Sequence, residues 1–233
     1  ADEPPVLVNK AGRTAGSKSY MWVYRSGHLY EDKQIVLYDY HKTRNSSHPK
    51  EFLKDYSGIC VTDGYQVYHK IEKEQETLRI AGCWVHARRK FDEAMNVVPK
   101  EQRNKSNAYL VMKQIQAIYR EENKLNDLSS EERLKERQVV VQPLVDAFFV
   151  YIKTLKVSKK DTFGDAVSYA LNQERYLRVF LEDGDVPIDN NASEREIRGF
   201  CIGKKNWQMI DTINGAKTSA IIYSIVETAK AND

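Results

Sequence analysis

The stretch VPIDNNASEREIR, residues 186–198, predicts the start of a helix that carries an acidic side chain on its inner face. A proline and an Asp-Asn-Asn run open the stretch, and Glu194 stands three residues after Asn191, which is the spacing of a capping pair. Ile197 and Cys201 follow Glu194 at i+3 and i+7, so the three share one helix face. A carboxylate there is unfavourable unless it caps its own helix, pairs with an arginine or binds a metal. The rest of the chain must decide between these alternatives.

The composition is that of a globular protein. The chain has 233 residues, enough to bury a core, with 41% hydrophobic and 30% charged residues. Its net charge of +3 does not by itself indicate a nucleic-acid ligand, so the distribution of basic residues matters more. Three scattered cysteines, no apolar run of membrane-spanning length and no signal peptide favour a cytoplasmic protein without disulfides or a membrane anchor. Nothing in the sequence supports a small-molecule cofactor.

The first hundred residues alternate between strand and helix patterns. Aromatic and β-branched residues at 20–24 and 35–40 predict an antiparallel hairpin, and residues 1–8 resemble the tail of a strand that we expect to begin upstream of residue 1. The other expected elements are a helix that begins near Pro49, strands at 59–62 and 78–83 and a basic helix at about 85–97. Together they predict a mixed β-sheet flanked by helices.

From about residue 99 to residue 182 the pattern is helical throughout. Tyr109, Met112, Ile115 and Tyr119 recur at helical spacing and predict a buried stripe. We therefore predict that an all-α insertion precedes the helix that carries Glu194. The expected domains are a core with the sheet at 1–98, the α-helical insertion at 99–183 and C-terminal helices of the core at 184–233.

The end of the chain predicts a loop and a closing helix. Residues 203–207 are predicted to form a basic loop, and Asn214-Gly215 a turn. A helix at 216–230 follows, and its expected inward residues are Ile221, Ile222, Ile225 and Ala229.

Acidic residues occupy three of the predicted strands or their ends. Asp63 comes directly after the strand at 59–62, at the carboxyl edge of the sheet, where α/β folds place their chemistry. Gly64 lets the chain turn sharply behind it. Asp2 is similarly placed on the first strand, and Asp39, within the third strand, is its rival. The alternative for Asp63 is a strand-to-helix cap.

Five motifs resemble the transposases of the bacterial insertion sequence 66 family. They are VTDGYQVY at 61–68, GCWVHARRKF at 82–91, PIDNNASEREIR at 187–198, GKKNW at 203–207 and IYSIVETAKAN at 222–232. The resemblance covers nearly the whole chain and is weakest across the helical block. Because the motifs are long and occur in order, the match is specific.

The resemblance implies an RNase H-like catalytic domain with an Asp-Asp-Glu (DDE) triad that binds two divalent metal ions. The matching residues are Asp2, in a segment that resembles Asp-Glu-Thr-Pro, Asp63 in Asp-Gly-Tyr and Glu194 in Asn-Asn-x-x-Glu-Arg. Pro4 stands where the first motif usually has threonine, a departure that affects the geometry expected for Asp2. Carboxylates are hard oxygen ligands for Mg²⁺ or Mn²⁺, and a pair of such ions supports in-line phosphoryl transfer.

Basic residues cluster in the same motifs and are candidates for binding the DNA backbone. The expected DNA-binding residues are His86, Arg88, Arg89, Arg195, Arg198, Lys204, Lys205 and Trp207, the last by stacking on a base. The alternatives are ordinary surface charge, ion pairs with neighbouring acids and, for Trp207, a place in the core. Cys83 and His86 have a zinc-like spacing but offer only two ligands, so a zinc site is not expected.

The sequence thus predicts the catalytic domain of a transposase that cleaves and joins DNA strands, a recombination reaction. The expected partners are transposon-end DNA, target DNA and further copies of the chain in the transposition complex. Two alternatives remain: a structure-directed nuclease on the same fold, and a domain that binds DNA but does not catalyse. The second follows from the clipped strand at Asp2, which we expect to leave this stretch of chain inactive if it displaces the aspartate.

Overall fold

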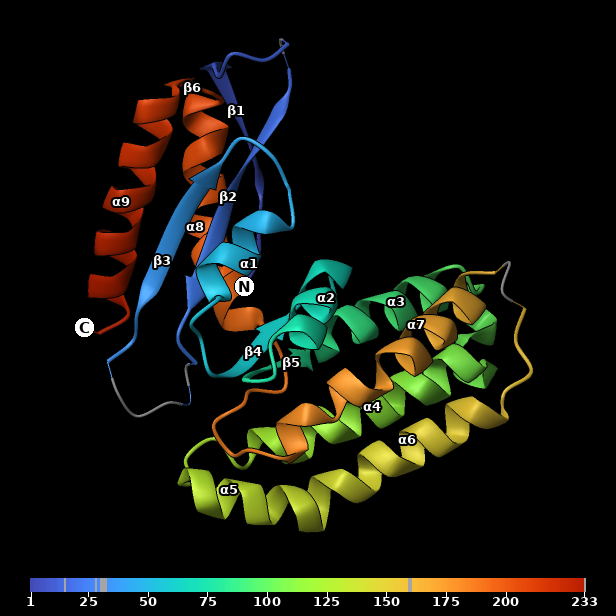
Figure 1. Ribbon diagram of the computed structural model, residues 1–233. Coiled ribbons are helices and arrows are strands. Elements are labelled where there is room, and N and C mark those ends of the chain that lie inside the picture. The colour runs from blue at the N-terminus through green and yellow to red at the C-terminus, as the bar shows by residue number, and fades with distance from the viewer. Residues whose placement is uncertain (15, 28, 30–32, 159–160, 233) are drawn as a thin grey trace. The chain divides into compact units, whose positions relative to one another are not determined.

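The computed structural model describes residues 1–14, 16–27, 29, 33–158 and 161–232 (Figure 1). These residues form two compact units. One comprises residues 1–79 and 190–233, and the other comprises residues 80–189. Most of the strands lie in the first unit, whereas the second is almost entirely helical. We call them the sheet unit and the helical unit.

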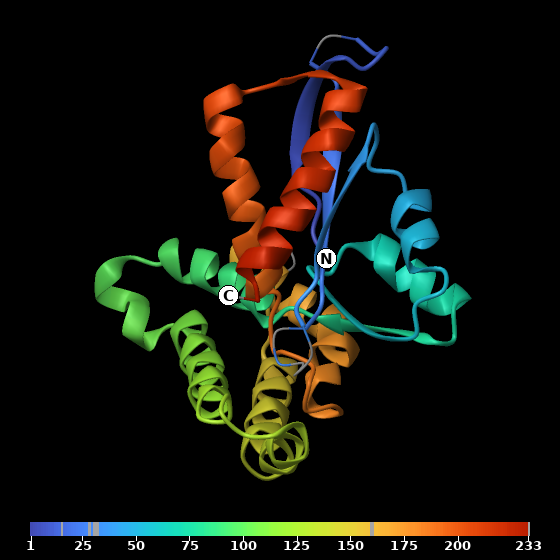
Figure 2. The same cartoon turned by 90° about the vertical axis from the view of Figure 1, so that its left-hand side faces the viewer.

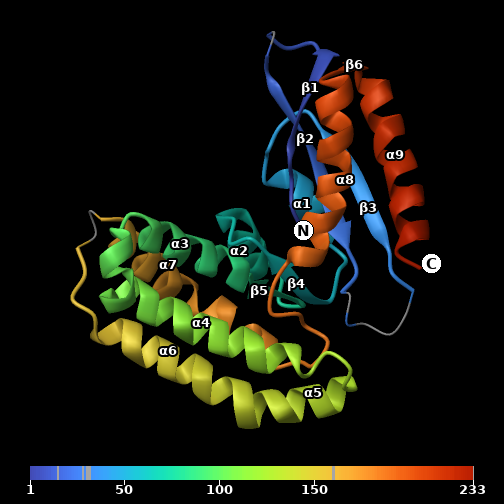
Figure 3. The same ribbon diagram turned by 180° about the vertical axis from the view of Figure 1, so that it is seen from behind.

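A four-stranded mixed sheet forms the centre of the sheet unit (Figures 1 and 3). Its strands are β1 (Pro5–Lys10), β2 (Lys18–Arg25), β3 (Val36–His41) and β6 (Ile210–Thr212). In the order β3-β2-β1-β6, the first three strands pair antiparallel, and β6 lies parallel to β1. The predicted hairpin and the predicted mixed sheet are confirmed. Two further strands, β4 (Gly58–Thr62) and β5 (Leu78–Gly82), form a separate sheet, so the prediction that they belong to the mixed sheet is wrong.

Helices cover both faces of the four-stranded sheet (Figure 2). They are α1 (Ser47–Leu53), α2 (Gln66–Glu74), α8 (Asn191–Trp207) and α9 (Ile213–Lys230). Side chains of β2 alternate between the faces, as the pleat of a strand requires. Met21 and Val23 lie in one core with Phe200 of α8, while Tyr24 stacks on Phe52 of α1 with ring centroids 3.6 Å apart.

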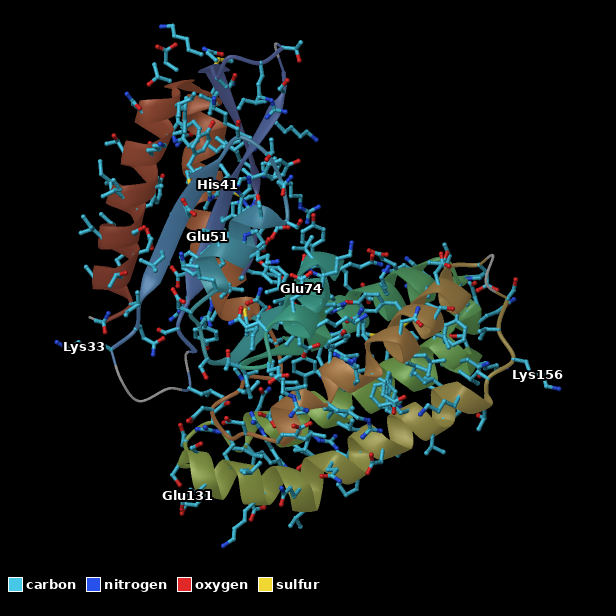
Figure 4. All side chains as sticks on the ribbon, viewed as in Figure 1. Lys33, His41, Glu51, Glu74, Glu131 and Lys156 are labelled. Carbon is cyan, nitrogen blue, oxygen red and sulfur yellow. The ribbon has the colours of Figure 1, made fainter. Side chains whose placement is uncertain are left out.

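Exposed ion pairs connect and flank the two short helices α1 and α2. Lys50 of α1 pairs with Glu74 of α2, and Lys54 pairs with Glu51 (Figure 4, where both glutamates are labelled). Such surface pairs add little stability. The position of α1 is therefore set mainly by packing, through the stacking on Tyr24 and the burial of Pro49 and Leu53.

The predicted basic loop at 203–207 is wrong, because α8 continues through these residues to Trp207. Gly203 suggested a break, but it serves a different purpose. A Cβ atom at this position would come within 2.6 Å of the hydroxyl oxygen of Tyr223 on α9. The glycine therefore allows the side chain of α9 to approach the backbone of α8.

The predicted inward face of α9 is also wrong. Ile221, Ile222 and Ile225 are 61%, 54% and 66% exposed, and Ala229 is exposed as well. The helix begins at Ile213, so the predicted turn at Asn214-Gly215 is its first turn, in which the hydroxyl of Thr212 accepts a hydrogen bond from the amide of Gly215.

The inner face of α9 carries hydroxyl groups instead of isoleucines. β3 is an edge strand, and its backbone needs hydrogen-bond partners. Ser224 accepts from the amide of Tyr38 at 2.8 Å, and Thr228 both accepts from the amide of Val36 at 3.0 Å and donates to its carbonyl at 2.9 Å. The small residues Ala216 and Ala220 are buried beside them. The apolar stripe was misplaced because the strand edge needs polar partners.

The helical unit contains no strand among its described residues after Gly82, as the periodicity predicts. Its elements are α3 (Trp84–Asn96), η1 (Lys100–Lys105), α4 (Asn107–Asn123), α5 (Ser130–Glu136), η2 (Arg137–Val141), α6 (Gln142–Thr154), α7 (Thr162–Leu177) and η3 (Val179–Leu181). Its core is aromatic: Trp84 contacts Phe148, Phe149 and Phe180 in edge-to-face geometry.

Local sequence signals account for the helix ends in this unit. Ser129 and Glu132 form a capping box at the start of α5. Pro143 lies in the first turn of α6, directly after a π-helical segment. Within the described residues, none of the helices combines the length and apolar character needed to cross a membrane.

The compact units divide the chain at different points from the predicted domains. The divisions fall between residues 79 and 80 and between 189 and 190, so α3 belongs to the helical unit. The predicted insertion began only at residue 99. The three-part domain assignment stays a prediction. The helical unit begins earlier than the predicted insertion, because it includes α3.

Candidate functional site

Asp2 is fixed by backbone pairing with β2. Its amide donates to the carbonyl of Val23 at 3.1 Å, and the amide of Val23 donates back at 2.8 Å. Pro4 continues this pairing, because its carbonyl accepts from Met21 at 3.0 Å. A proline lacks the amide donor but keeps the carbonyl acceptor. The departure at Pro4 therefore does not interrupt the register that carries Asp2 along β2.

Asp63 lies at the end of β4, where the sequence places it. Its Oδ1 atom accepts a hydrogen bond of 2.9 Å from the amide of Tyr65, which forms a tight side-chain turn. Gly64 between them has φ +88°, a left-handed conformation that glycine adopts without strain. Two residues earlier, the carbonyl of Val61 accepts from the amino nitrogen of Ala1 at 2.9 Å. The segment before Asp63 thus lies against the residue before Asp2.

Glu194 lies in the first turn of α8 and is half-buried. The predicted capping pair with Asn191 is wrong, because the N-cap is Asn190 and its side chain makes no capping bond. The amide group of that side chain instead donates to the carbonyl of Ala1 at 3.1 Å, in a buried contact. The start of α8 therefore also lies against the residue before Asp2.

A buried ion pair holds α8 on the sheet at the same end. Arg25 of β2 donates to Glu196 at 2.7 Å, and the two side chains are only 11% and 14% exposed. The hydroxyl of Tyr38 donates to the carbonyl of Glu196 at 2.9 Å. The turn of helix that bears Glu194 is thus anchored to both β2 and β3.

Two of the predicted catalytic carboxylates, Asp63 and Glu194, lie within electrostatic reach of the third, Asp2. Burial raises the pKa of Asp2 above its ordinary value, and the charges of Asp63 and Glu194 raise it further. The hydrogen bond from the amide of Glu3 opposes this increase in pKa. Asp2 is therefore the centre of a partly buried acidic group to which three separate segments of chain contribute.

The chemistry of this group fits a hard divalent cation. Three carboxylates repel one another, and a cation would relieve both the repulsion and the burial of Asp2. Across the described ranges, however, no three His, Cys, Asp or Glu side chains are grouped closely enough to form a metal site. The charges of Asp63 and Glu194 thus influence Asp2, but the three carboxylates are not close enough together to coordinate one ion as they stand.

The rival aspartate is engaged elsewhere. Asp39 lies on β3, where its carboxylate contacts the imidazole of His41 at 2.7 Å (His41 is labelled in Figure 4). The ring of His41 in turn stacks on His48, with centroids 3.8 Å apart. Burial lowers the pKa of His48, and the neighbouring His41 lowers it further. The structure therefore gives Asp39 a histidine partner.

Two charged residues near Asp2 were not singled out from the sequence. Glu3 is buried, and its Oε1 atom accepts a hydrogen bond of 2.8 Å from the guanidinium of Arg44. Burial raises the pKa of Glu3 to about 6, although the bond to Arg44 lowers it. The position of Glu3 beside Asp2 is visible in the sequence, but its contact with a residue 41 positions away is not.

The predicted DNA-binding residues of the sheet unit lie on α8. Arg195, Arg198 and Lys205 are exposed, whereas the ammonium of Lys204 donates to the carbonyl of Pro5. Trp207 packs against Phe200 with ring centroids 5.6 Å apart, so its ring contributes to the core. The two lysines, with Cys201 and Gln208, line a shallow pocket. The exposed side chains of Arg195, Arg198 and Lys205 are therefore accessible to a ligand from solvent.

The other predicted DNA-binding residues lie on α3 of the helical unit. Arg88 and Arg89 are exposed and His86 is half-buried. The guanidinium carbon of Arg88 lies 5.8 Å from the ring centroid of Tyr119, whose hydroxyl donates to Asp189 at 3.2 Å. Both arginines therefore lie on the surface of their own unit, where Arg88 also contacts Tyr119.

The fold and the site define a mixed α/β protein with a partly buried group of carboxylates at the start of β1. The chain belongs to the Transposase IS66 family, whose family model matches residues 1–218. The family that the motifs suggested is therefore confirmed.

Relatives in Sinorhizobium fredii (strain NBRC 101917 / NGR234) agree with this assignment. The chain is 30% identical to uncharacterized protein y4qI over 245 residues, covering 100% of this chain and 44% of that protein. It is 29% identical to uncharacterized protein y4hP over 210 residues, covering 85% of this chain and 38% of that protein. The chain thus spans less than half the length of these relatives. No solved structure matches it significantly.

Proposed function

We propose that this chain is the catalytic domain of a DDE transposase, which cleaves and joins DNA strands at transposon ends. The observation that carries the proposal is the meeting of three segments at Ala1 and Asp2. The carbonyl of Val61 and the side chain of Asn190 both bond to Ala1. Val61 and Asn190 shortly precede Asp63 and Glu194 in the sequence, and the charges of these two carboxylates raise the pKa of Asp2. We assign the sheet unit to the RNase H-like class through the family, and its mixed sheet flanked by helices agrees with that class.

The proposed metal ligands are Asp2, Asp63 and Glu194. Two bound Mg²⁺ or Mn²⁺ ions would activate water or a 3′-hydroxyl group and stabilise the leaving oxygen of the DNA phosphate. The chain itself orients the ligands. Backbone pairing with Val23 holds Asp2, the turn at Tyr65 holds one oxygen of Asp63, and the Arg25–Glu196 pair anchors the helix of Glu194. These contacts fix the backbone segment that carries each proposed ligand.

DNA is the proposed partner of the exposed cations on α8. Arg195 follows Glu194 directly, and Arg198 stands one helical turn further on. Contacts from such residues to phosphates position the substrate without reading its sequence, and they weaken as salt rises. A homo-oligomer in the complex with transposon-end and target DNA remains part of the proposal.

Calorimetric titration of Mn²⁺ tests the metal site directly. The parent chain should bind Mn²⁺ near neutral pH, and both Asp63→Asn and Glu194→Gln should weaken binding by more than about tenfold. Asp39→Asn, which removes the rival carboxylate on β3, is the matched control and should bind as the parent does.

Unchanged binding in both site variants would exclude the proposed ligands, and loss in Asp39→Asn alone would favour the rival. A strand-transfer assay on a labelled transposon-end duplex then tests the reaction. Activity that depends on Asp63 and Glu194 but is equal on any branched DNA would indicate a structure-directed nuclease instead.

A further inference from the structure

Arg44, in the loop between β3 and α1, contacts two segments that lie far apart in the chain. Its Nε atom donates to Oε1 of Glu3 at 2.8 Å, and its Nη2 atom bonds to the same oxygen. On its other side, the guanidinium carbon lies 4.0 Å from the ring centroid of Tyr65, in cation–π contact. The hydroxyl of Tyr65 also makes a long hydrogen bond of 3.5 Å to the carbonyl of Arg44.

Each partner of Arg44 is bonded to a proposed metal ligand. The amide of Glu3 donates to Oδ1 of Asp2 at 2.7 Å, and the amide of Tyr65 donates to Oδ1 of Asp63 at 2.9 Å. A continuous path of contacts therefore runs from Asp2 through Glu3, Arg44 and Tyr65 to Asp63. One guanidinium group connects the two loops that present these carboxylates.

The form of the Glu3–Arg44 pair indicates that stability alone does not explain it. The side chain of Glu3 is 1% exposed, whereas that of Arg44 is 41% exposed. The second oxygen of Glu3, Oε2, is buried and has no hydrogen-bond partner among the described residues. A pair selected for stability would satisfy both oxygens, because a buried unpaired acceptor is unfavourable.

We propose that Arg44 is a positioning residue that holds the Asp2 and Asp63 segments at the separation which metal binding requires. The inference rests on the proposed function for its purpose, but the link between the two segments can be measured without metal. Groups that orient metal ligands from behind typically change metal affinity about 10–100-fold when they are removed. A planar guanidinium both forks onto a carboxylate and stacks on an aromatic ring, and an ammonium does neither equally well.

The first test is hydrogen exchange of the metal-free chain in the parent and in Arg44→Gln. Loss of the link should speed exchange of the amides of Glu3 and Tyr65 by about tenfold or more, because both bonds to carboxylates then open more often. Exchange along β3 should not change. Arg44→Lys should give an intermediate rate, and Arg120→Gln, which removes an exposed arginine paired with Glu121 in the helical unit, should match the parent. Circular dichroism establishes that each variant is folded.

The second test is Mn²⁺ titration of the same variants, with Asp63→Asn as reference. Arg44→Gln should weaken binding about 10–100-fold, Arg44→Lys less, and Arg120→Gln not at all. If Asp63→Asn loses binding while Arg44→Gln keeps it, the proposed metal site stands and the positioning role fails. If exchange at both amides is unchanged in folded Arg44→Gln, the positioning role fails whatever the metal titration shows. Faster exchange with no Mn²⁺ binding by the parent would support the link and reject the metal site.

Discussion

Each unit buries a glutamate beside an arginine, and the Glu122–Arg137 pair of the helical unit differs from the Glu3–Arg44 pair of the sheet unit in how completely it is satisfied. In the helical unit, Arg137 is fully buried, and its Nε atom bonds to both oxygens of Glu122, at 3.0 and 3.1 Å. Its Nη1 atom donates to the carbonyls of Phe180 and Asp183, at 2.7 and 2.8 Å. This pair ties α4, η2 and η3 together with no carboxylate oxygen left over.

The pair in the sheet unit is less complete. Arg44 reaches only one oxygen of Glu3, and the other oxygen is buried without a partner among the described residues. In the same part of the chain, the buried hydroxyls of Tyr24, Thr62 and Tyr68 also lack described partners. Unsatisfied buried groups in a native structure call for an explanation, and functional sites are a common one. In the helical unit both oxygens of the buried glutamate are bonded, whereas the sheet unit leaves one oxygen of Glu3 unsatisfied beside the proposed metal ligands.

Arg137→Ala should cause the largest effect and tests the stabilising side of the comparison. Removing one partner of a fully buried pair leaves Glu122 buried and charged, which lowers the free energy of unfolding by about 3–5 kcal/mol. Urea denaturation followed by circular dichroism measures the change. Lys124→Ala, which removes an exposed partner of Glu121, is the control and should leave the midpoint almost unchanged. A loss for Arg137→Ala as small as that of the control would contradict the stabilising role of this ion pair.

Glu3→Gln should reveal the unfavourable burial of Glu3 as a dependence of stability on pH. Burial raises the pKa of Glu3 from its ordinary 4.5 to about 6 in the folded chain. Below 4.5 the carboxyl is protonated in both states, and as pH rises through 6 the unfolded chain releases its proton more readily. The parent therefore loses about 2 kcal/mol of stability across this window, which glutamine does not lose.

The measurement is the difference in unfolding free energy between Glu3→Gln and the parent, without metal, at about pH 4 and about pH 8. It should shift in favour of the variant by about 2 kcal/mol over that range. A constant difference would show that the buried carboxylate is compensated as fully as Glu122 is, and the contrast between the two pairs would disappear.

Much of the sheet unit follows from local signals in the sequence. Alternating aromatic and β-branched residues predicted β2 and β3, and the glycine after Asp63 placed that carboxylate at a strand end. Asp2 could not be found in this way, because no pattern marks a single residue at the start of a strand. Its place on the first predicted strand made it a candidate with Asp39 as rival, and the family motif selected it. The catalytic roles of Asp2, Asp63 and Glu194 stay predictions.

The features that the sequence did not reveal depend on distant neighbours. Gly203 resembled a helix break, but its role is set by the hydroxyl of Tyr223 on another helix. The isoleucines of α9 resembled a core stripe, but β3, which α9 covers, needs hydroxyl partners from Ser224 and Thr228. Arg44 meets Glu3 across 41 positions. Periodicity reports which face of a helix is apolar, and it does not report what a neighbouring element requires.

The hydroxyl groups of Tyr119 and Tyr24 show the same difference between the two units for a single hydrogen bond. Tyr119 in the helical unit donates to Asp189 at 3.2 Å, whereas the hydroxyl of Tyr24 in the sheet unit is buried with no partner in the described ranges. Tyr119→Phe should lower the free energy of unfolding by about 1 kcal/mol, because a hydrogen bond is lost and Asp189 loses a donor. Tyr24→Phe should be neutral or stabilising, since it removes a buried polar atom that forms no bond. Both variants keep the aromatic ring, so urea denaturation of the two isolates the hydroxyl groups. Equal losses in the two variants would mean that the hydroxyl of Tyr24 is satisfied in solution, and the polar interior around Glu3 would then be as complete as the network around Arg137.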